Sequence, residues 1–194
     1  GLAFFYGGMD RSRNVLNMLM MNFYCLLIVP IVWVAVGFSL AQTPVENDFI
    51  GGFDSLFLKD ITVAGDGSKL ASVAFLGMFA VITPALISGA IVERARIKAW
   101  LLFVALWSVV VYTPVAHWVW GIGGFLREAG TLDFAGGIVV HINAGIAALV
   151  TALVLGKRLG YPGNVAPPHN LPFAVLGTGI LWFGWFGFNA GSAL

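Results

Sequence analysis

Residues 131–145 read TLDFAGGIVVHINAG, and they set an acid and an imidazole into what is otherwise a membrane-spanning pattern. Ionisable side chains inside a span are costly and usually face a bundle interior or a water-filled path. His141 is therefore a candidate pore residue, although an ordinary packing histidine would look the same. Asp133 stands where a helix would begin, and an acid there accepts hydrogen bonds from the free N–H groups of the first turn. We expect Asp133 to cap the helix rather than to bind a ligand.

The residues that share a helical face with His141 are all small. At α-helical spacing they are Gly137, Ala144, Gly145 and Ala148. Small residues let helices approach one another closely in membranes. We therefore expect His141 to point inward, toward other helices of a bundle.

Composition places the chain among multi-pass membrane proteins. It is 59% hydrophobic and 10% charged, with a mean hydropathy of +0.93, which is far from the composition of a soluble domain. The net charge of +1 gives no sign of a nucleic-acid partner. Cys25 is the single cysteine, so no internal disulfide can form. We predict an all-α transmembrane bundle that forms one domain over residues 1–194, with no cofactor and no metal site.

Hydropathy divides the chain into apolar spans separated by polar turns. The segment 16–40 carries no charge over 25 residues, which is enough to cross a bilayer. Pro30, Pro84 and Pro114 lie inside spans and should kink them. The two outermost segments look like pieces of spans cut by the ends of the chain. The predicted spans are residues 1–6 (the end of a first span), 16–40, 70–92, 99–120, 134–155 and 173–194.

Orientation follows from the lysines and arginines, which favour cytoplasmic loops. The turns at 7–15, 93–98 and 156–172 hold seven of them, whereas the loops at 42–69 and 121–133 hold three. We therefore expect the three turns in the cytoplasm, the two loops outside, and the whole chain in the plasma or inner membrane.

Aromatic and hydroxyl groups should meet near the outer ends of three spans. Phe79, Trp120 and Ser192 fall at a similar outer depth when helical rise is counted. Aromatic faces can hold a small cation by cation–π attraction, and a hydroxyl oxygen can accept its hydrogen bond. Aromatic residues near helix ends are more often membrane-interface residues, so the pattern alone leaves both interpretations open. Further aromatic residues lie on the same faces at helical spacing: Phe75, Trp185 and Phe188.

Several motifs resemble the ammonium transporter/Rhesus channel family, on its ammonium transporter branch. The resemblance implies 11 spans built from two inverted halves and a homotrimer with one pore per subunit. This chain would cover the end of the first span to most of the sixth. The motifs follow the family's order along almost the whole chain: FYGGMDRSRNVL, SGAIVERARIKAW, VAHWVWG, LDFAGGIVVHINAG, GKRLGY, PHNLPF and WFGWFGFNAGSA.

The family's outer site maps onto residues already singled out. The resemblance implies that Phe79, Trp120 and Ser192 recruit ammonium as the substrate-binding residues, with methylammonium as an analogue. Asp133 matches an aspartate that shapes this site without binding the ion, which agrees with the cap interpretation.

The family's pore maps onto a second group of residues. Phe188 matches a stacked phenylalanine that gates the pore, with Phe75 and Trp185 beside it on the same faces. His141 matches the first of the family's twin pore histidines. Tyr6 matches a tyrosine linked to polar or water-filled routes that could carry protons. The resemblance also implies a PII-type signalling protein as a partner on the cytoplasmic face.

Two residues depart from the family pattern. Leu76 stands where many members have glutamine, and Asp10 puts an acid in a turn that the family keeps apolar or basic. Neither touches a matched site residue. The expected mechanism is that NH4+ is recruited outside, loses its proton near Phe188, and crosses as NH3 past His141.

Other functions stay open at this point. An ammonium sensor or transceptor would use the same site and pass the signal to a further domain. A Rhesus-type channel for CO2 is disfavoured, because Trp120 and Ser192 fit cation capture. A hydrolase built on Ser192, His141 and Asp133 is disfavoured too, because the inferred depths separate the serine from the histidine and no nucleophile elbow is present.

Overall fold

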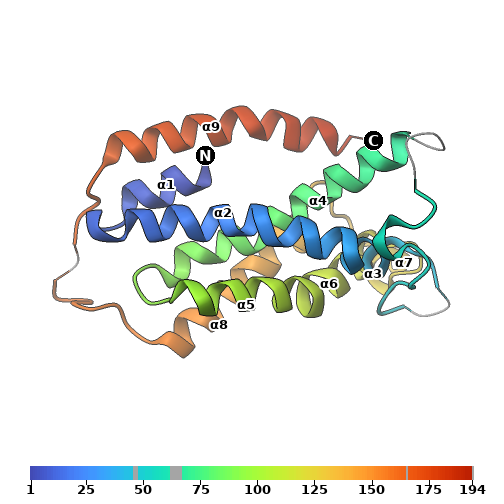
Figure 1. Ribbon diagram of the computed structural model, residues 1–194, viewed down its shortest axis with the longest axis horizontal. Coiled ribbons are helices and arrows are strands. Elements are labelled where there is room, and N and C mark those ends of the chain that lie inside the picture. Colours follow the sequence, from blue (N-terminus) through green and yellow to red (C-terminus); the bar gives the residue numbers. More distant parts are fainter. Residues whose placement is uncertain (46–47, 62–66, 165, 194) are drawn as a thin grey trace.

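The computed structural model describes residues 1–45, 48–61, 67–164 and 166–193, and within these ranges the regular structure is helical, with no strand. Figure 1 shows long helices lying side by side in one bundle. Five helical segments are long and apolar enough to cross a membrane, so the predicted all-helical transmembrane bundle is confirmed. These segments are Ser12–Gln42, Gly67–Ile91, Ile97–Glu128, Gly137–Leu155 and Leu171–Gly191.

The first four long segments are assembled from shorter helices that follow one another. The elements are, in chain order, α1 (Leu2–Met9), η1 (Ser12–Asn14), α2 (Val15–Val32), η2 (Trp33–Gly37), α3 (Phe38–Gln42), η3 (Leu56–Leu58), α4 (Gly67–Ile87), η4 (Ser88–Ile91), α5 (Ile97–Trp107), η5 (Ser108–Tyr112), α6 (Thr113–Trp120), α7 (Phe125–Glu128), η6 (Gly137–Ile142), α8 (Asn143–Leu155) and α9 (Leu171–Gly191).

Three of the spans contain a stretch of π-helix, at η2, η5 and η6. A π turn closes with i→i+5 hydrogen bonds and so holds one more residue than an α turn. Pro30 lies three residues before η2, and Pro114 lies two residues after η5. Proline lacks the N–H that continues an α-helix. The expected irregularities at these two prolines therefore fall next to π turns, while Pro84 lies inside α4.

Buried tryptophans join α2, α4 and α5 into the core of the bundle. Trp100 is 1% exposed, and its indole Nε1–H donates to the Met21 carbonyl at 2.8 Å. The indole of Trp33 donates to the Val73 carbonyl at 3.0 Å. A buried N–H costs free energy unless it finds such an acceptor. These bonds therefore fix how the three helices pack.

Three turns meet at one end of the bundle, and they are the three turns with most of the lysines and arginines. The Glu93 carboxylate, between α4 and α5, lies 3.1 Å from Arg11 Nε and 3.1 Å from Arg158 Nη2. His169 Nδ1 lies 2.8 Å from the Asp10 carbonyl oxygen. These contacts tie the α1–α2 turn to the α4–α5 turn and to the α8–α9 connection.

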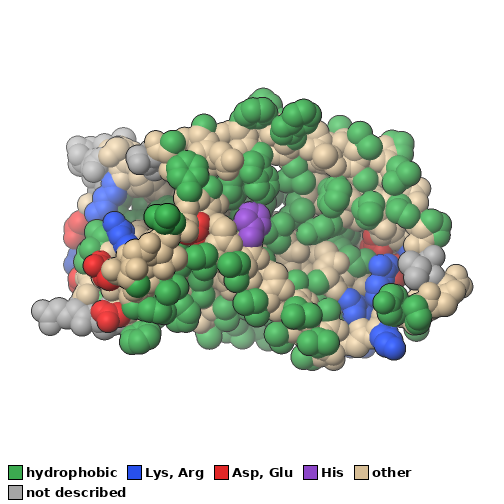
Figure 2. Space-filling view, turned by 180° about the vertical axis from the view of Figure 1, so that it is seen from behind, with side chains coloured by type: hydrophobic (Ala, Val, Ile, Leu, Met, Phe, Trp, Pro, Cys, Tyr) green, Lys and Arg blue, Asp and Glu red, His purple; other side chains and the backbone are tan. Residues whose placement is uncertain are grey.

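The α9 helix lies along one side of the bundle, next to α1 (Figure 1). A Cβ at Gly177 would lie 2.3 Å from the Phe5 amide nitrogen, and a Cβ at Gly8 would lie 2.5 Å from the Ala174 nitrogen. Only glycine permits this close backbone contact. Figure 2 shows apolar side chains over the middle of the molecule and charged ones toward its two ends, as expected for a bundle that crosses a bilayer.

Candidate functional site

Phe79 of α4 is the centre of an aromatic cluster that draws on three helices. Its ring is 1% exposed. The ring of Trp120, at the end of α6, meets it edge to face, with 5.4 Å between centroids. Phe75 lies one turn along α4 at 4.9 Å, and Phe188 of α9 lies at 4.4 Å. Residues that are distant in sequence thus form one block of rings.

A cavity of about 490 Å³ opens beside this cluster, lined by Phe79, Trp120, Asp133 and Ser192 among others. Ser192 follows directly after α9, and its hydroxyl donates to the Phe188 carbonyl at 2.9 Å. The Ser192 hydroxyl proton is therefore engaged in this bond, and the hydroxyl oxygen keeps lone pairs that can accept a hydrogen bond. An aromatic face, an indole and a hydroxyl oxygen surround one space.

The rings continue inward from the cluster as a row. Phe188 stacks on Trp185 of the same helix, with centroids 4.7 Å apart and ring planes 21° apart. Trp185 stacks in turn on the imidazole of His141 from η6, at 5.8 Å and 26°. We call Trp120, Phe79, Phe188, Trp185 and His141 the aromatic row. It joins the cavity beside Phe79 and Trp120, which the sequence predicts to be the outer one, to the imidazole by ring contacts alone.

Asp133 builds the start of the helix that carries His141. Its Oδ1 accepts the N–H groups of Gly136 and Gly137, both at 2.7 Å, and its Oδ2 accepts those of Ile138 and Val139 at 2.8 and 3.0 Å. Four first-turn donors are thereby satisfied by one carboxylate. The helix begins at Gly137 rather than at the predicted residue 134, because the preceding residues form this capping turn.

The backbone of the same residue holds the outer indole. Trp120 donates its Nε1–H to the Asp133 carbonyl at 3.0 Å. Asp133 therefore caps a helix with its side chain and orients Trp120 with its main chain. Its role at the cavity is to hold other groups in place.

Among the helices that the structure describes, His141 contacts α9 through Trp185, and the prediction that it points toward other helices of the bundle stays a prediction. His141 is exposed, and a Cβ built on Gly145 would meet nothing within 4 Å. The buried side of the helix carries Val139, Val140 and Ala144 instead.

The π-helical turn changes one of the four predicted neighbours. The His141 N–H bonds to the Gly136 carbonyl at 3.0 Å, five residues back, so Gly137 no longer lies one α turn before His141. Ala144, Gly145 and Ala148 belong to α8 and keep α-helical spacing. The His141 ring packs on Trp185 and otherwise faces an open side of the bundle.

Tyr6 is not part of the aromatic row. Its hydroxyl donates to the Leu86 carbonyl at 3.1 Å, and its ring fills the space where a Cβ on Gly89 would lie. Tyr6 therefore ties α1 to the end of α4.

Sequence reasoning missed three polar residues that line the outer cavity, namely Gln42, Ser72 and Arg127. Arg127 donates to the Trp120 carbonyl at 2.6 Å, so its charge is turned toward the backbone. It is the single basic residue between 121 and 133, and that signal could have identified it.

Apolar helices, a bundle with charged ends and an aromatic row that begins at buried Phe79 define a multi-pass membrane protein with a candidate conduction path. The family model described as the Ammonium Transporter Family matches residues 1–194. The chain belongs to that family, and the resemblance seen in the motifs is confirmed.

Individual relatives support the same family assignment. An ammonium transporter of Aquifex aeolicus (strain VF5) is 52% identical over 198 residues, which cover all of this chain and 46% of the relative. The crystal structure of Candida albicans Mep2 superimposes with a TM-score of 0.85 at 37% identity, covering 98% of this chain and 44% of Mep2. A structure described as a sensor Amt protein gives a TM-score of 0.87 at 33% identity and covers 98% and 49%. The chain thus spans about half the length of the proteins it matches.

Proposed function

We propose that the protein containing this chain moves ammonium across a membrane and is not an enzyme. Membership of the ammonium transporter family supports the substrate class. The observation that carries the mechanism is the aromatic row, which links the outer cavity to His141 by ring contacts of 4.4–5.8 Å. Phe79 and Trp120 would attract NH4+ through their π faces, and Ser192 would accept one of its hydrogen bonds.

Loss of a proton then precedes passage. A charge at the bilayer centre costs between about 3 and 17 kcal/mol, depending on the method, so an apolar path favours neutral NH3. Phe188 lies against Phe79 with 4.4 Å between the ring centroids, so passage requires these rings to move. His141 would meet NH3 beyond the Phe79–Phe188 contact. A neutral imidazole suits this position because it can either donate or accept a hydrogen bond.

The exposed side of His141 would be covered by a segment corresponding to the remaining length of the relatives. The coverage of 46% of the Aquifex protein and 44% of Mep2 supports this part of the proposal, because both relatives are longer than this chain. Residues 1–194 would then hold part of the pore, and we expect them not to support methylammonium uptake when expressed alone.

Uptake of methylammonium by cells without their own ammonium transporters tests the proposal. We expect Trp120→Leu to lower uptake at low substrate concentration by about 10-fold, since a desolvated cation–π contact contributes about 1–2 kcal/mol. We expect His141→Ala to lower uptake at all concentrations. Trp182→Leu is the control, because Trp182 is 70% exposed and lies outside the aromatic row. Wild-type uptake in both test variants would overturn the proposal.

Charge movement needs its own measurement. A current recorded from the purified protein in a planar bilayer, in step with ammonium transport, would mean that the proton follows a separate route. Transport without current would mean that the proton returns outside.

Assembly and orientation are further parts of the proposal. We infer a homotrimer that serves nitrogen uptake, with the turns at 7–15, 93–98 and 156–172 in the cytoplasm, where a PII-type protein could dock. A cysteine introduced at Arg13, which is exposed, should react with a membrane-impermeant thiol reagent only after the cells are opened. Labelling of this cysteine in intact cells would mean that the three turns lie outside the cell and that the proposed orientation is wrong.

A sensor is the second candidate, and the similarity to a sensor Amt protein favours it. Robust uptake by the wild-type protein would exclude a purely sensing role. A hydrolase has less support, because the Asp133 carboxylate is occupied by four N–H groups and the Ser192 hydroxyl is bonded to Phe188. Reaction of Ser192 with a serine-hydrolase probe would support the hydrolase. Conduction of CO2 without ammonium uptake would favour a Rhesus-type gas channel.

A further inference from the structure

Gln42 is the last residue of α3, and it lines the cavity beside Phe79 and Trp120. The end of α3 is held against α6, because His117 Nδ1 lies 3.1 Å from the Ala41 carbonyl oxygen. His117 is fully buried and belongs to the same helix as Trp120. The backbone next to Gln42 is therefore fixed against the helix that carries the indole, although Gln42 is not part of the aromatic row.

The side-chain amide of Gln42 has a cost to stability. Its Nε2 is buried and has no hydrogen-bond partner among the residues that the structure describes. A buried donor without an acceptor destabilises the folded state, and native proteins contain few of them. Proteins keep such unfavourable groups mainly at functional sites. A role for the other end of the amide, its oxygen, would account for the buried nitrogen.

Two hydroxyl groups on the wall of the same cavity present oxygen atoms to it. The Ser72 hydroxyl donates to the Ser68 carbonyl at 3.1 Å, and the Ser192 hydroxyl donates to the Phe188 carbonyl at 2.9 Å. Because each proton is engaged with a backbone carbonyl, each oxygen keeps lone pairs for a donor in the cavity. The amide oxygen of Gln42 would be a third neutral acceptor on this wall.

The charged side chains of the cavity wall oppose each other. Asp133 and Arg127 both line the cavity and have opposite signs. The Asp133 carboxylate accepts four backbone N–H groups, and Arg127 donates to the Trp120 carbonyl at 2.6 Å. Binding of an ion that carries N–H donors therefore depends on the aromatic faces and on the neutral acceptors.

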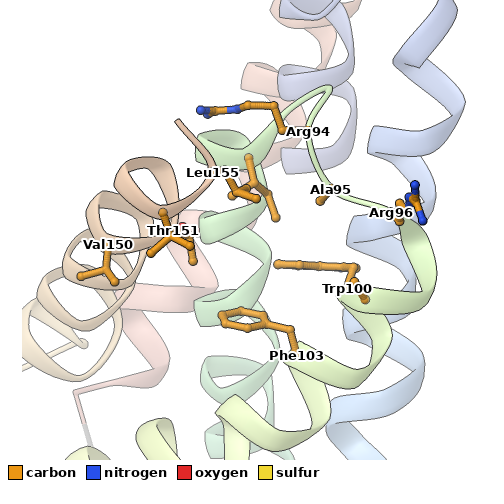
Figure 3. Close-up of a pocket in the computed structure, with 11 residues that line it drawn as sticks. Arg94, Ala95, Arg96, Trp100, Phe103, Val150, Thr151 and Leu155 are labelled. Atoms are coloured by element: carbon orange, nitrogen blue, oxygen red, sulfur yellow. The ribbon is translucent and has the colours of Figure 1, made fainter. Parts of the chain in front are cut away.

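The cavity between α5 and α8 has a different chemistry (Figure 3). Its volume is about 400 Å³, which is similar to the 490 Å³ of the cavity beside Phe79. Trp100 and Phe103 extend into it from α5, and Arg94 lies at one end. The Trp100 indole nitrogen bonds to the Met21 carbonyl, so the ring adds only hydrocarbon to the wall. Hydrocarbon beside a positive charge does not suit a small cation, whereas the neutral acceptors beside Phe79 do.

We propose that Gln42 is a further ammonium-binding residue, with its amide oxygen turned into the cavity to accept a hydrogen bond from the ion. A cavity of about 490 Å³ holds the ion together with several waters, since one water takes up about 30 Å³ in the liquid. The amide oxygen replaces one water that the ion sheds before it reaches Phe188. Gln42 thus acts in capture and not in passage. The inference rests on the proposed function, because it takes ammonium as the ligand.

Uptake of methylammonium by Gln42→Leu in the full-length protein tests the proposal. We expect a half-saturation concentration about 10-fold higher and an unchanged maximal rate, because a hydrogen bond to a charged group is lost in capture alone. The substitution also removes the buried donor, so the unfolding temperature should equal or exceed that of the wild type. Thr178→Val is the matched control, since the Thr178 hydroxyl bonds to the Ala174 carbonyl at 2.8 Å outside the cavity.

The same variant can contradict the proposal in two ways. A wild-type half-saturation concentration would overturn it. A lower unfolding temperature together with a lower maximal rate would overturn it too, since Gln42 would then support the fold instead of binding the ion. Gln42→Met removes the amide with a side chain of different shape and gives the same test if Gln42→Leu does not fold.

Thermal unfolding in ammonium chloride separates this inference from the proposed function. A ligand that binds the folded state raises the unfolding temperature according to the ratio of its concentration to its Kd. We expect ammonium chloride to stabilise the wild type more than sodium chloride does, and Gln42→Leu to need about 10-fold more ammonium for the same gain. This result without uptake would contradict transport and leave the assignment of Gln42 standing. Uptake with equal ammonium responses of the two proteins would contradict the assignment of Gln42 alone, and a wild type with neither uptake nor stabilisation would overturn both.

Discussion

The α4 and α9 segments are both apolar enough to span a membrane, yet they are packed very differently. In the most apolar window of the α4 span 50% of the residues are buried, whereas in that of α9 only 11% are. The α4 helix packs against α2 and α8, while α9 is held mainly by α1. Hydropathy therefore indicates that a segment can cross a bilayer, and contacts decide whether it faces protein.

The difference concerns the proposed path, because α9 supplies Phe188 and Trp185 and is followed by Ser192. Its attachments are few: the glycine contacts with α1, the rings at Phe79 and His141, and Phe75, which fills the space beside Gly191. Each attachment can be tested separately.

The largest effect is expected at the α1–α9 contact. Gly177→Ala would push a methyl group against the Phe5 amide nitrogen, at 2.3 Å, and backbone atoms cannot move aside. We expect a loss of about 3 kcal/mol, at the upper end of overpacking effects. Thermal unfolding of the purified protein measures it. Gly179→Ala is the matched control on the same helix, since a Cβ there meets nothing within 4 Å. If both variants unfold alike, α9 is not held by close contact with α1.

The cap of the His141 helix should come next. Asp133→Ala leaves four N–H groups without their acceptor, and we expect a loss of about 2 kcal/mol. Asp133→Asn keeps one acceptor oxygen and should lose about half as much. Thermal unfolding gives the stabilities. Wild-type stability in Asp133→Ala would show that the start of this helix is held by its neighbours instead.

A smaller effect is expected at the start of α9. The Asn170 side chain accepts the Phe173 N–H at 3.0 Å and caps the helix. We expect Asn170→Ala to cost about 1 kcal/mol and Asn170→Ser or Asn170→Asp to cost less, because these residues also cap helices. Hydrogen exchange of the first-turn amides of α9 is the direct measurement. Unchanged exchange in Asn170→Ala would contradict the assignment.

The smallest effect concerns the pH dependence of stability, and it comes from the end of the bundle where the three turns meet. Burial, together with the neighbouring Glu93 carboxylate, raises the pKa of Asp10 to about 6. A raised carboxyl pKa means that the folded state holds the proton more tightly, so stability increases as pH falls through 6. Between pH 7 and 5.5 we expect a gain of about 0.8 kcal/mol from this group.

Asp10→Asn should remove this gain, and the difference between the two proteins isolates it from other titrations. The pKa of Glu93 is lowered, with Arg158 and Arg11 among its neighbours, so its contribution is lost only below the usual glutamate range. Identical pH profiles for wild type and Asp10→Asn would refute the prediction.

The sequence predicted the five membrane-length segments that the described residues contain and five of the residues that line the cavity beside Phe79, namely Phe75, Phe79, Trp120, Asp133 and Ser192. Both depend on hydrophobic runs and on helical rise, which act locally. It did not predict that the described helices leave one side of His141 open, because residue types do not show which helices pack against a given face. Arg127 was missed because a loop arginine is ordinarily solvated, and only the folded loop brings it to Trp120.

The three π turns also bear on how the family's sequences can change length. Each successive residue of an α-helix turns by about 100°. A π turn covers about the same rotation with one residue more, so deleting one residue before His141 within η6 would restore α-helical winding and leave the imidazole on about the same face relative to the cap at Asp133. A homologue that is one residue shorter between 137 and 140 could therefore keep its histidine on the same helical face, whereas a deletion in the α-helical stretch of α8 would rotate everything that follows it.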